Sequence, residues 1–281
     1  MKKLYIDIGG TYLRSELQSQ NGSVFQTLSS AEKGLFAYIC ETIKENREIG
    51  FVGIAYAGQV FEGEILSAPN ITVDEARIKY RVEAEYGVHL EIDNDLNCAV
   101  MAEAEHYGAQ SIAALYVGTG LGAAFIDGGR LVRGGRNLAF EIGHVPYRNA
   151  PFACGCGREN CIELFASGSG IGKWLRYFCR DTASDLAALK ASEAQEENVI
   201  AEQFEAAILH AAGTVVNMAN PLLLVLGGGI VNANPYLCEL LKRRLEAFAL
   251  KPSLELLRIE ISVLENAPMQ GAKLLEKRNY G

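Results

Sequence analysis

The sequence has no apolar run long enough to cross a membrane. The longest, LLLVLGGGIV, covers residues 222–231, whereas a transmembrane helix needs about 20 residues. The start, MKKLYIDIGG, reaches Asp7 after three apolar residues, too short a run for a signal peptide. We therefore expect a cytoplasmic protein that does not act at a membrane.

Positive charge is in the minority. The 281 residues include 26 Lys and Arg against 34 Asp and Glu, a formal net charge of −8 at pH 7, and the sequence contains no basic cluster. A surface of this sign repels the phosphates of nucleic acids. We therefore expect no nucleic-acid partner.

Linkers rich in Pro, Gly or Ser and low-complexity segments are also absent. With 49% hydrophobic and 21% charged residues, the chain is typical of a globular protein and is long enough for two domains. The P-loop pattern is missing, and GTGLG at 118–122 does not fit G-x-G-x-x-G. P-loop and Rossmann nucleotide sites are therefore disfavoured.

Cysteine is concentrated in one stretch, EIGHVPYRNAPFACGCGRENCIE at 141–163. Cys154, Cys156 and Cys161 stand as C-x-C-x4-C, with His144 upstream. Three thiolates and one imidazole are a ligand set that tetrahedral Zn²⁺ takes, and four protein ligands leave no position for a reactive water. We expect a structural zinc site in a reducing compartment; free thiols or a disulfide pair are the alternative.

Two stretches share the pattern of strand, glycine–threonine turn and strand. They are IDIGGTYLRSEL near the start and IAALYVGTGLGAAFIDGG at 112–129. We interpret them as one fold unit used twice, each offering backbone N–H groups to a phosphate. Asp7 can hold a hydrated Mg²⁺ there, or it caps a plain hairpin turn. The glycines at 227–229 permit close approach of a flat ligand or form a strand-to-helix turn.

Asn94 and Asp95 follow the alternating strand at 88–92 and precede a helix expected at 96–107. One interpretation is that they cap this helix. The other is that the helix dipole keeps a carboxylate ionised, ready to accept a proton from a substrate hydroxyl. Hydrophobic periodicity predicts the remaining elements, which are helices near 32–46, 73–86, 169–179, 184–191, 196–218, 234–248 and from 270, and strands at 4–8, 13–18, 51–56, 222–226 and 257–263.

Together these motifs resemble the ROK family of bacterial sugar kinases and repressors. The resemblance runs from DIGGT at 7–11 to GAKLL at 271–275, and its most specific part is EIGH followed by CGCG-x-x-x-C-x-E. It implies an α/β fold, the two-domain actin-like ATPase (ribonuclease H-like) fold with a structural zinc loop. The N-terminal domain would be 1–110 plus a helix at 266–281, and the C-terminal domain 111–265 would carry the zinc loop.

The resemblance also implies a reaction and assigns roles. MgATP would phosphorylate a hexose or N-acetylhexosamine hydroxyl, with glucose and O6 as the default, in a homodimer or homotetramer. Asp95 would be the general base. The residues implied for the nucleotide are Asp7, Gly9, Gly10, Thr11, Gly118, Thr119, Gly120, Gly227, Gly228 and Gly229; for the sugar, Asn70, Asn94, Asp95, Glu141, His144 and Glu163; and for zinc, His144, Cys154, Cys156 and Cys161.

Three positions depart from the family pattern. Ala57 stands where a proline is usual, Tyr12 where many members have lysine, and Asn160 where glycine commonly precedes the third cysteine. Family repressors add an N-terminal winged helix, for which a phosphate loop at residue 7 leaves no room, so we do not expect a transcriptional regulator. A sugar sensor without catalysis is a further alternative. A zinc-finger module is disfavoured because no basic helix accompanies the cysteines.

Overall fold

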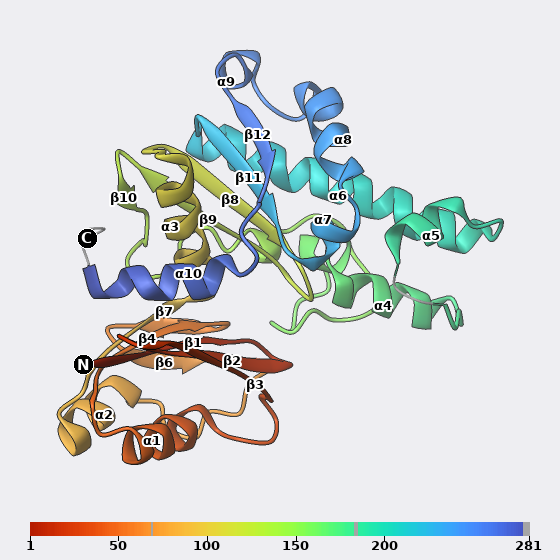
Figure 1. Ribbon diagram of the computed structural model, residues 1–281. Coiled ribbons are helices and arrows are strands. Elements are labelled where there is room, and N and C mark those ends of the chain that lie inside the picture. Colours follow the sequence, from red (N-terminus) through yellow and green to blue (C-terminus); the bar gives the residue numbers. More distant parts are fainter. Residues whose placement is uncertain (69, 183–184, 278–281) are drawn as a thin grey trace. The chain divides into compact units, whose positions relative to one another are not determined.

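The computed structural model describes residues 1–68, 70–182 and 185–277 (Figure 1). Residue 69, which precedes the expected sugar residue Asn70, residue 184 of the helix expected at 184–191 and residues 278–281 of the expected C-terminal helix lie outside these ranges. The chain divides into two compact units. The first comprises Met1–Gly108, Arg130–Ala139 and the chain from Leu264, and the second comprises Ala109–Gly129 and Phe140–Val263. The segment Arg130–Ala139 begins with β10 (Arg130–Leu131). It belongs to the first unit, whereas the expected division placed it in the C-terminal domain.

The first unit is built on a mixed sheet with the strand order β3-β2-β1-β4-β7. Strands β1, β2 and β3 are antiparallel neighbours, whereas β1, β4 and β7 are parallel. A separate hairpin pairs β5 with β6. The bounds are β1 (Lys2–Ile8), β2 (Tyr12–Ser19), β3 (Gly22–Ser29), β4 (Ile49–Tyr56), β5 (Gln59–Phe61), β6 (Glu64–Ser67) and β7 (His89–Asn94).

Helices cover both faces of this sheet. Figure 1 shows α1 and α2 on one face and α10 with α3 on the other, where α10 packs against α3, β1 and β4. A Cβ on Gly271 would lie 1.8 Å from the carbonyl oxygen of Cys98, so only glycine allows α10 this close to α3. The bounds are α1 (Leu35–Glu45), α2 (Ile78–Tyr86), α3 (Asp95–Tyr107), α10 (Ala267–Leu274) and the 3-10 turn η4 (Leu275–Lys277).

The helix predicted at 73–86 begins only at Ile78, so the prediction is wrong for its first five residues. The reason is that Asp74 caps a different helix. Its carboxylate accepts hydrogen bonds from the N–H groups of Phe36 (3.1 Å) and Ala37 (3.0 Å) in the first turn of α1. The residue before α1 is Gly34, which has no side chain to do this itself.

The second unit repeats the strand arrangement. Its strands lie in the order β9-β8-β11-β12, with β8 and β9 antiparallel and β8, β11 and β12 parallel. The two strand–turn–strand stretches therefore occupy the same place in the two sheets, as a fold unit used twice requires. The bounds are β8 (Ile112–Val117), β9 (Leu121–Asp127), β11 (Leu223–Gly227) and β12 (Arg258–Ile261).

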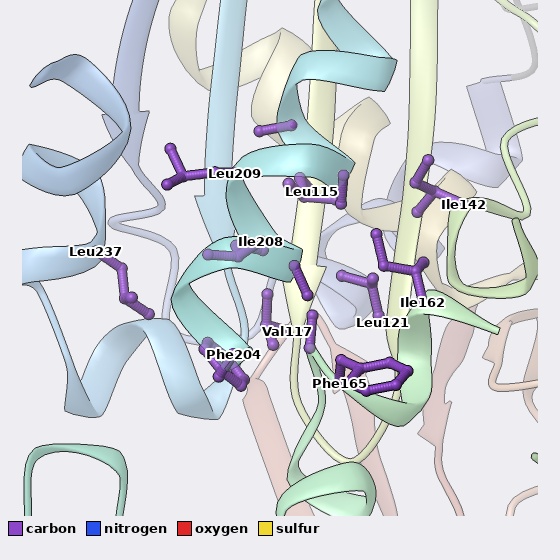
Figure 2. Packing of buried hydrophobic residues seen from close by; sticks show 14 of the residues in the cluster. Leu115, Val117, Leu121, Ile142, Ile162, Phe165, Phe204, Ile208, Leu209 and Leu237 are labelled. Carbon is purple, nitrogen blue, oxygen red and sulfur yellow. The ribbon is translucent and has the colours of Figure 1, made fainter. Parts of the chain in front are cut away.

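The long helix α6 (Gln195–Ala219) forms the centre of the second core. Figure 2 shows its residues Phe204 and Ile208 among Leu115, Val117 and Phe165. By length and composition α6 is able to cross a membrane, but 61% of its most apolar window is buried inside the protein, as in a core helix. The other helices of this unit are α4 (Gly168–Tyr177), α5 (Leu186–Ala191), α7 (Gly229–Ala233), α8 (Tyr236–Arg244) and α9 (Lys251–Leu254), with 3-10 turns η1 (Ile142–His144), η2 (Ile162–Leu164) and η3 (Leu245–Ala247).

Candidate functional site

The first glycine turn joins β1 to β2 and is held by its own backbone. The N–H of Gly9 donates to the carbonyl of Tyr12 (2.9 Å). A Cβ on Gly10 would lie 2.7 Å from the Cβ of Asn70, so the glycine lets Asn70 approach the turn. The structure thus brings Gly9, Gly10, Thr11 and Asn70 together in the first unit.

Asp7 lies beside this turn in a buried position. Its Oδ2 accepts hydrogen bonds from Asn266 Nδ2 (3.0 Å) and Arg14 Nη1 (3.4 Å). Burial raises the pKa of Asp7 above its ordinary value, although both partners oppose the rise. A buried carboxylate of this kind is suited to a cation partner.

Asn94 caps α3, as one of the two interpretations required. Its Oδ1 accepts hydrogen bonds from the N–H groups of Leu96 (2.9 Å) and Asn97 (3.3 Å), and its Nδ2 donates to the carbonyl of Gly58 (3.1 Å). Asp95 is the first residue of α3, and its Oδ1 accepts from the N–H of Leu96 (3.0 Å). The helix N-terminus therefore stabilises the ionised Asp95 carboxylate.

Sequence reasoning did not identify the neighbouring Asp93 as a site residue. Asp93 is 1% exposed, and Arg133 Nη1 donates to its Oδ2 at 2.5 Å. Its Oδ1 accepts from the side-chain amides of Asn97 (2.9 Å) and Asn137 (3.0 Å). The signal in the sequence was the D-N-D triplet, but Arg133 and Asn137 are 40 or more residues away along the chain.

The second glycine turn, Gly118–Gly120, is held by residues at the end of the cysteine stretch and just after it. Gly168 N–H donates to Gly118 O (2.9 Å), and Ser169 N–H donates to Thr119 O (3.0 Å). Glu163 Oε2 accepts from the N–H of Leu121 (3.1 Å). These hydrogen bonds stabilise the conformation of the turn.

The glycines at 227–229 form a strand-to-helix turn. Gly227 ends β11 and Gly229 begins α7. Gly228 has a φ of 91°, and a Cβ there would lie 2.4 Å from the carbonyl oxygen of Val117. The structure supports the turn interpretation for Gly227 and Gly228, while a Cβ on Gly229 would meet nothing within 4 Å.

Glu141, His144 and Glu163 lie in the second unit around the turns η1 and η2. Desolvation raises the pKa of Glu141, the nearby His144 lowers it, and the charge of Glu163 raises it. The preceding residue, Phe140, has a φ of 64° and packs against Phe125 with ring centroids 5.4 Å apart. Such a backbone conformation is costly for a bulky residue, so this stretch is held in place by its packing.

The four expected zinc ligands converge. One ligand atom from each of His144, Cys154, Cys156 and Cys161 lies within 4.8 Å of the others. Cys156 and Cys161 sulfurs are 3.4 Å apart, and Cys154 Sγ lies 3.7 Å from His144 Nδ1. A tetrahedral zinc with Zn–S bonds of about 2.3 Å separates its ligands by about 3.8 Å, so the donor set fits this ion.

The three thiols differ in how readily they ionise. Burial raises the pKa of Cys154 and raises that of Cys161 to about 12. Burial also opposes ionisation of Cys156, but hydrogen bonds from Arg158 outweigh it and lower its pKa to about 6. A divalent cation is the partner that would make all three thiolates stable together.

Two of the three departures from the family pattern have a local explanation. The N–H of Ala57 donates to the carbonyl of Ile8 (2.9 Å), a bond that proline could not make. Arg14 lies over the Tyr12 ring at 5.4 Å, so a cation is retained beside the first turn. Nothing in the structure explains Asn160.

Comparison with known proteins gives a consistent result. The ROK family model matches residues 4–279. The chain is 31% identical to a glucokinase of Streptomyces coelicolor over 61% of this chain and 58% of that protein. It is 30% identical to an N-acetyl-D-glucosamine kinase of Vibrio vulnificus over 58% of each. These matches thus span a little over half the length of the curated relatives.

Solved structures share the fold along nearly the whole chain. The Lmo2764 protein of Listeria monocytogenes superposes with a TM-score of 0.82 at 23% identity and covers 100% of both chains. A ROK glucokinase from Streptomyces griseus, in complex with glucose and AMPPNP, gives 0.75 at 21% identity and covers 97% of this chain and 98% of its own. A ROK transcriptional regulator gives 0.81 at 19% identity and covers 99% and 78%. With the family model matched from residue 4 to residue 279, the chain belongs to the ROK family.

Proposed function

We propose that the protein is an ATP-dependent kinase that phosphorylates a hydroxyl group, O6, of a hexose or N-acetylhexosamine, with glucose as the preferred substrate. The observation that carries the proposal is Asp95, a carboxylate placed in the first turn of α3 beside the Asn94 cap. A carboxylate there can take the proton of a substrate hydroxyl. The glucokinase and N-acetylglucosamine kinase relatives support this assignment.

The proposed mechanism separates proton transfer from phosphate binding. Asp95 removes the hydroxyl proton, and the resulting oxygen attacks the γ-phosphoryl group of ATP in line. The N–H groups of Gly9 and Gly118 are bonded within their own turns. The N–H groups of Gly10, Thr11, Thr119 and Gly120 would therefore be the ones that contact the phosphates, and Asp7 would hold the hydrated Mg²⁺ that accompanies ATP. Catalysis of phosphoryl transfer requires mainly such positioning and charge neutralisation from a protein. The turn at 227–229 would contact the adenosine.

Sugar binding and zinc binding share one histidine in this proposal. His144 presents Nδ1 to the cysteine cluster, which leaves Nε2 to bond a sugar hydroxyl alongside Glu141, Glu163, Asn70 and Asn94. Zn²⁺ bound by His144 and the three cysteines would supply structure to this loop and fix the tautomer of the imidazole. We further propose a cytoplasmic homodimer or homotetramer in the actin-like fold, without nucleic-acid or membrane partners.

The alternative is a sugar sensor without catalysis, because a ROK transcriptional regulator shares the fold. A coupled ADP-release assay with MgATP against a panel of hexoses and N-acetylhexosamines separates the two. A kinase turns over one sugar strongly. A sensor binds a sugar, detected by calorimetry, and releases no ADP above the rate without sugar.

The base is tested by Asp95→Asn, which keeps the shape of the side chain but removes its basicity. We expect kcat to fall by roughly 10²–10⁴, the usual contribution of general acid–base catalysis, with a modest change in sugar binding. Turnover within about threefold of the unmodified enzyme would show that another group takes the proton.

A further inference from the structure

Asn137 uses its entire side-chain amide within the first unit. Its Nδ2 donates to Val60 O (2.8 Å) and to Asp93 Oδ1 (3.0 Å). Its Oδ1 accepts from Arg133 Nη1 (2.9 Å) and Asn97 Nδ2 (3.0 Å). An amide has two N–H donors and two acceptor lone pairs, so all four positions are satisfied. No other side chain of this size offers the same set.

The backbone of Asn137 is equally specific. Its φ of 59° lies in the left-handed region, which asparagine and glycine adopt far more readily than most residues do. Glycine can therefore replace Asn137 without straining the chain while it removes all four hydrogen bonds. This makes it possible to test the amide separately from the backbone.

Asp93 accepts hydrogen bonds at both of its carboxylate oxygens. The N–H of Asn94 (2.8 Å) adds to the bonds from Asn97, Asn137 and Arg133 described above. A cavity of about 250 Å³ borders Asp93, Arg133 and Asn137, with Ile92 and Met101 also in its wall. The Asp93 side chain is nevertheless only 1% exposed, so its buried charge depends on the hydrogen bonds that it accepts.

The network reaches the first turn of α3 from both sides of Asp95. Asn94 precedes Asp95 and receives the N–H of Asn97, while the Asn97 side chain is bonded to Asp93 and Asn137. Asn94, directly before Asp95, and Asn97, two positions after it, are therefore both hydrogen-bonded to Asp93. A movement of Asn97 would rotate the turn that carries Asp95.

We propose that Asn137, together with Arg133, is a positioning residue that holds the first turn of α3 so that Asp95 points at the substrate hydroxyl. The proposal rests on the function proposed above for Asp95. It predicts that loss of the Asn137 amide damages the chemical step more than sugar binding, because displacements of about 1 Å near a reacting group can cost on the order of 100-fold in rate.

Asn137→Gly is the test, and Asn220→Gly is its matched control. Asn220 is also left-handed (φ 46°), lies exposed at the end of α6 in the second unit, and makes no side-chain hydrogen bond to the residues that the structure describes. For Asn137→Gly we expect kcat to fall by about 10- to 50-fold and the sugar KM to stay within about threefold. For Asn220→Gly both should stay within about twofold.

Hydrogen exchange of the Leu96 and Asn97 amides provides a second readout that needs no turnover. We expect Asn137→Gly to speed their exchange at least about tenfold, as local opening of the turn requires, with no change in Asn220→Gly. Unchanged exchange, or an unchanged kcat in folded Asn137→Gly, overturns the proposal. If Asn137→Gly does not fold, Asn137→Asp, which keeps the size and loses both donors, is measured instead with the same expectations. If the unmodified protein phosphorylates no sugar, the proposed function fails, while the exchange measurement still decides whether Asn137 orders α3.

Discussion

The two units share a strand arrangement but stabilise their acidic side chains by different means. In the first unit, Asp93 is paired with Arg133, and Asp7 accepts from Arg14 and Asn266. In the second, Glu163 accepts from the N–H of Leu121 and faces Cys154, which belongs to a cluster of three thiols. The first polar site is thus neutralised by its own side chains, whereas the second gathers three thiols and a histidine whose donor atoms fit a cation.

The largest effect should follow from removing one of the four proposed zinc ligands. For Cys161→Ser we expect zinc content to drop well below one per chain and the midpoint of thermal unfolding to fall by about 10 °C. An ion whose free concentration is roughly 1,000 times its dissociation constant stabilises the folded state by about 4 kcal/mol. Each kcal/mol shifts the unfolding midpoint by about 2–4 °C. Elemental analysis and calorimetry measure the two quantities.

Cys179→Ser is the control for this experiment because Cys179 is exposed in the same unit and outside the cluster. It should keep both zinc and stability. Full zinc content in Cys161→Ser would contradict the four-ligand site.

A smaller effect is expected from Arg133→Met in the first unit. The substitution leaves the Asp93 carboxylate buried without its cation, which costs about 3–5 kcal/mol in a fully buried pair. Since the Arg133 side chain is 31% exposed, we expect a loss of about 2–3 kcal/mol in the free energy of unfolding, measured by urea denaturation. Arg81→Met, which breaks exposed ion pairs with Glu75 and Glu85, should cost less than about 1 kcal/mol. Equal losses in the two variants would show that the Asp93 pair is no stronger than a surface pair.

The smallest expected effect is a gain in stability, from substitution of Asp7. Because the pKa of Asp7 is raised in the fold, the folded state holds the Asp7 proton more tightly than the unfolded state. The unfolding free energy therefore falls as pH rises from the ordinary aspartate pKa through the raised one. Asp7→Asn should thus stabilise the protein at pH 7 by about 0.5–2 kcal/mol, a usual range for stabilising changes at functional sites.

This gain should shrink as the pH is lowered toward about 4, where Asp7 becomes protonated in the unmodified protein too. Urea denaturation at pH 7 and at about pH 4 measures the free energy of unfolding of each variant. Glu48→Gln is the control, and its unfolding free energy should change little because Glu48 is exposed. A less stable Asp7→Asn at pH 7 would mean that Arg14 and Asn266 more than offset the cost of burial.

Most of the fold was predictable because strong apolar strands and one long amphipathic helix dominate the sequence. The helix expected at 196–218 is α6, Gln195–Ala219, and the strand expected at 4–8 lies within β1. Strand β3 was missed because Gly22–Ser29 is an edge strand with its side chains mostly exposed, so burial leaves no alternating pattern in it. The start of α2 was missed because Asp74 serves another helix.

The candidate site was predictable only where its residues are close in the sequence. The cysteine stretch carries its ligands within 18 residues, from His144 to Cys161, and the structure brings all four together. The Asp93 cluster depends on Arg133 and Asn137, which reach it through a segment assigned to the other domain by simple division of the chain. Spacing cannot reveal partners that tertiary folding alone brings together.

The close contact of Gly271 with Cys98 also has a consequence for synthesis on the ribosome. The first unit starts the chain, yet α10, made at 267–274, completes it by packing against α3, β1 and β4. The last strand of the second unit, β12, ends at Ile261 and so emerges earlier. Domains generally fold as units during translation. The unit that is begun first is therefore finished last, and its sheet face must wait for α10 while the nascent chain is still growing.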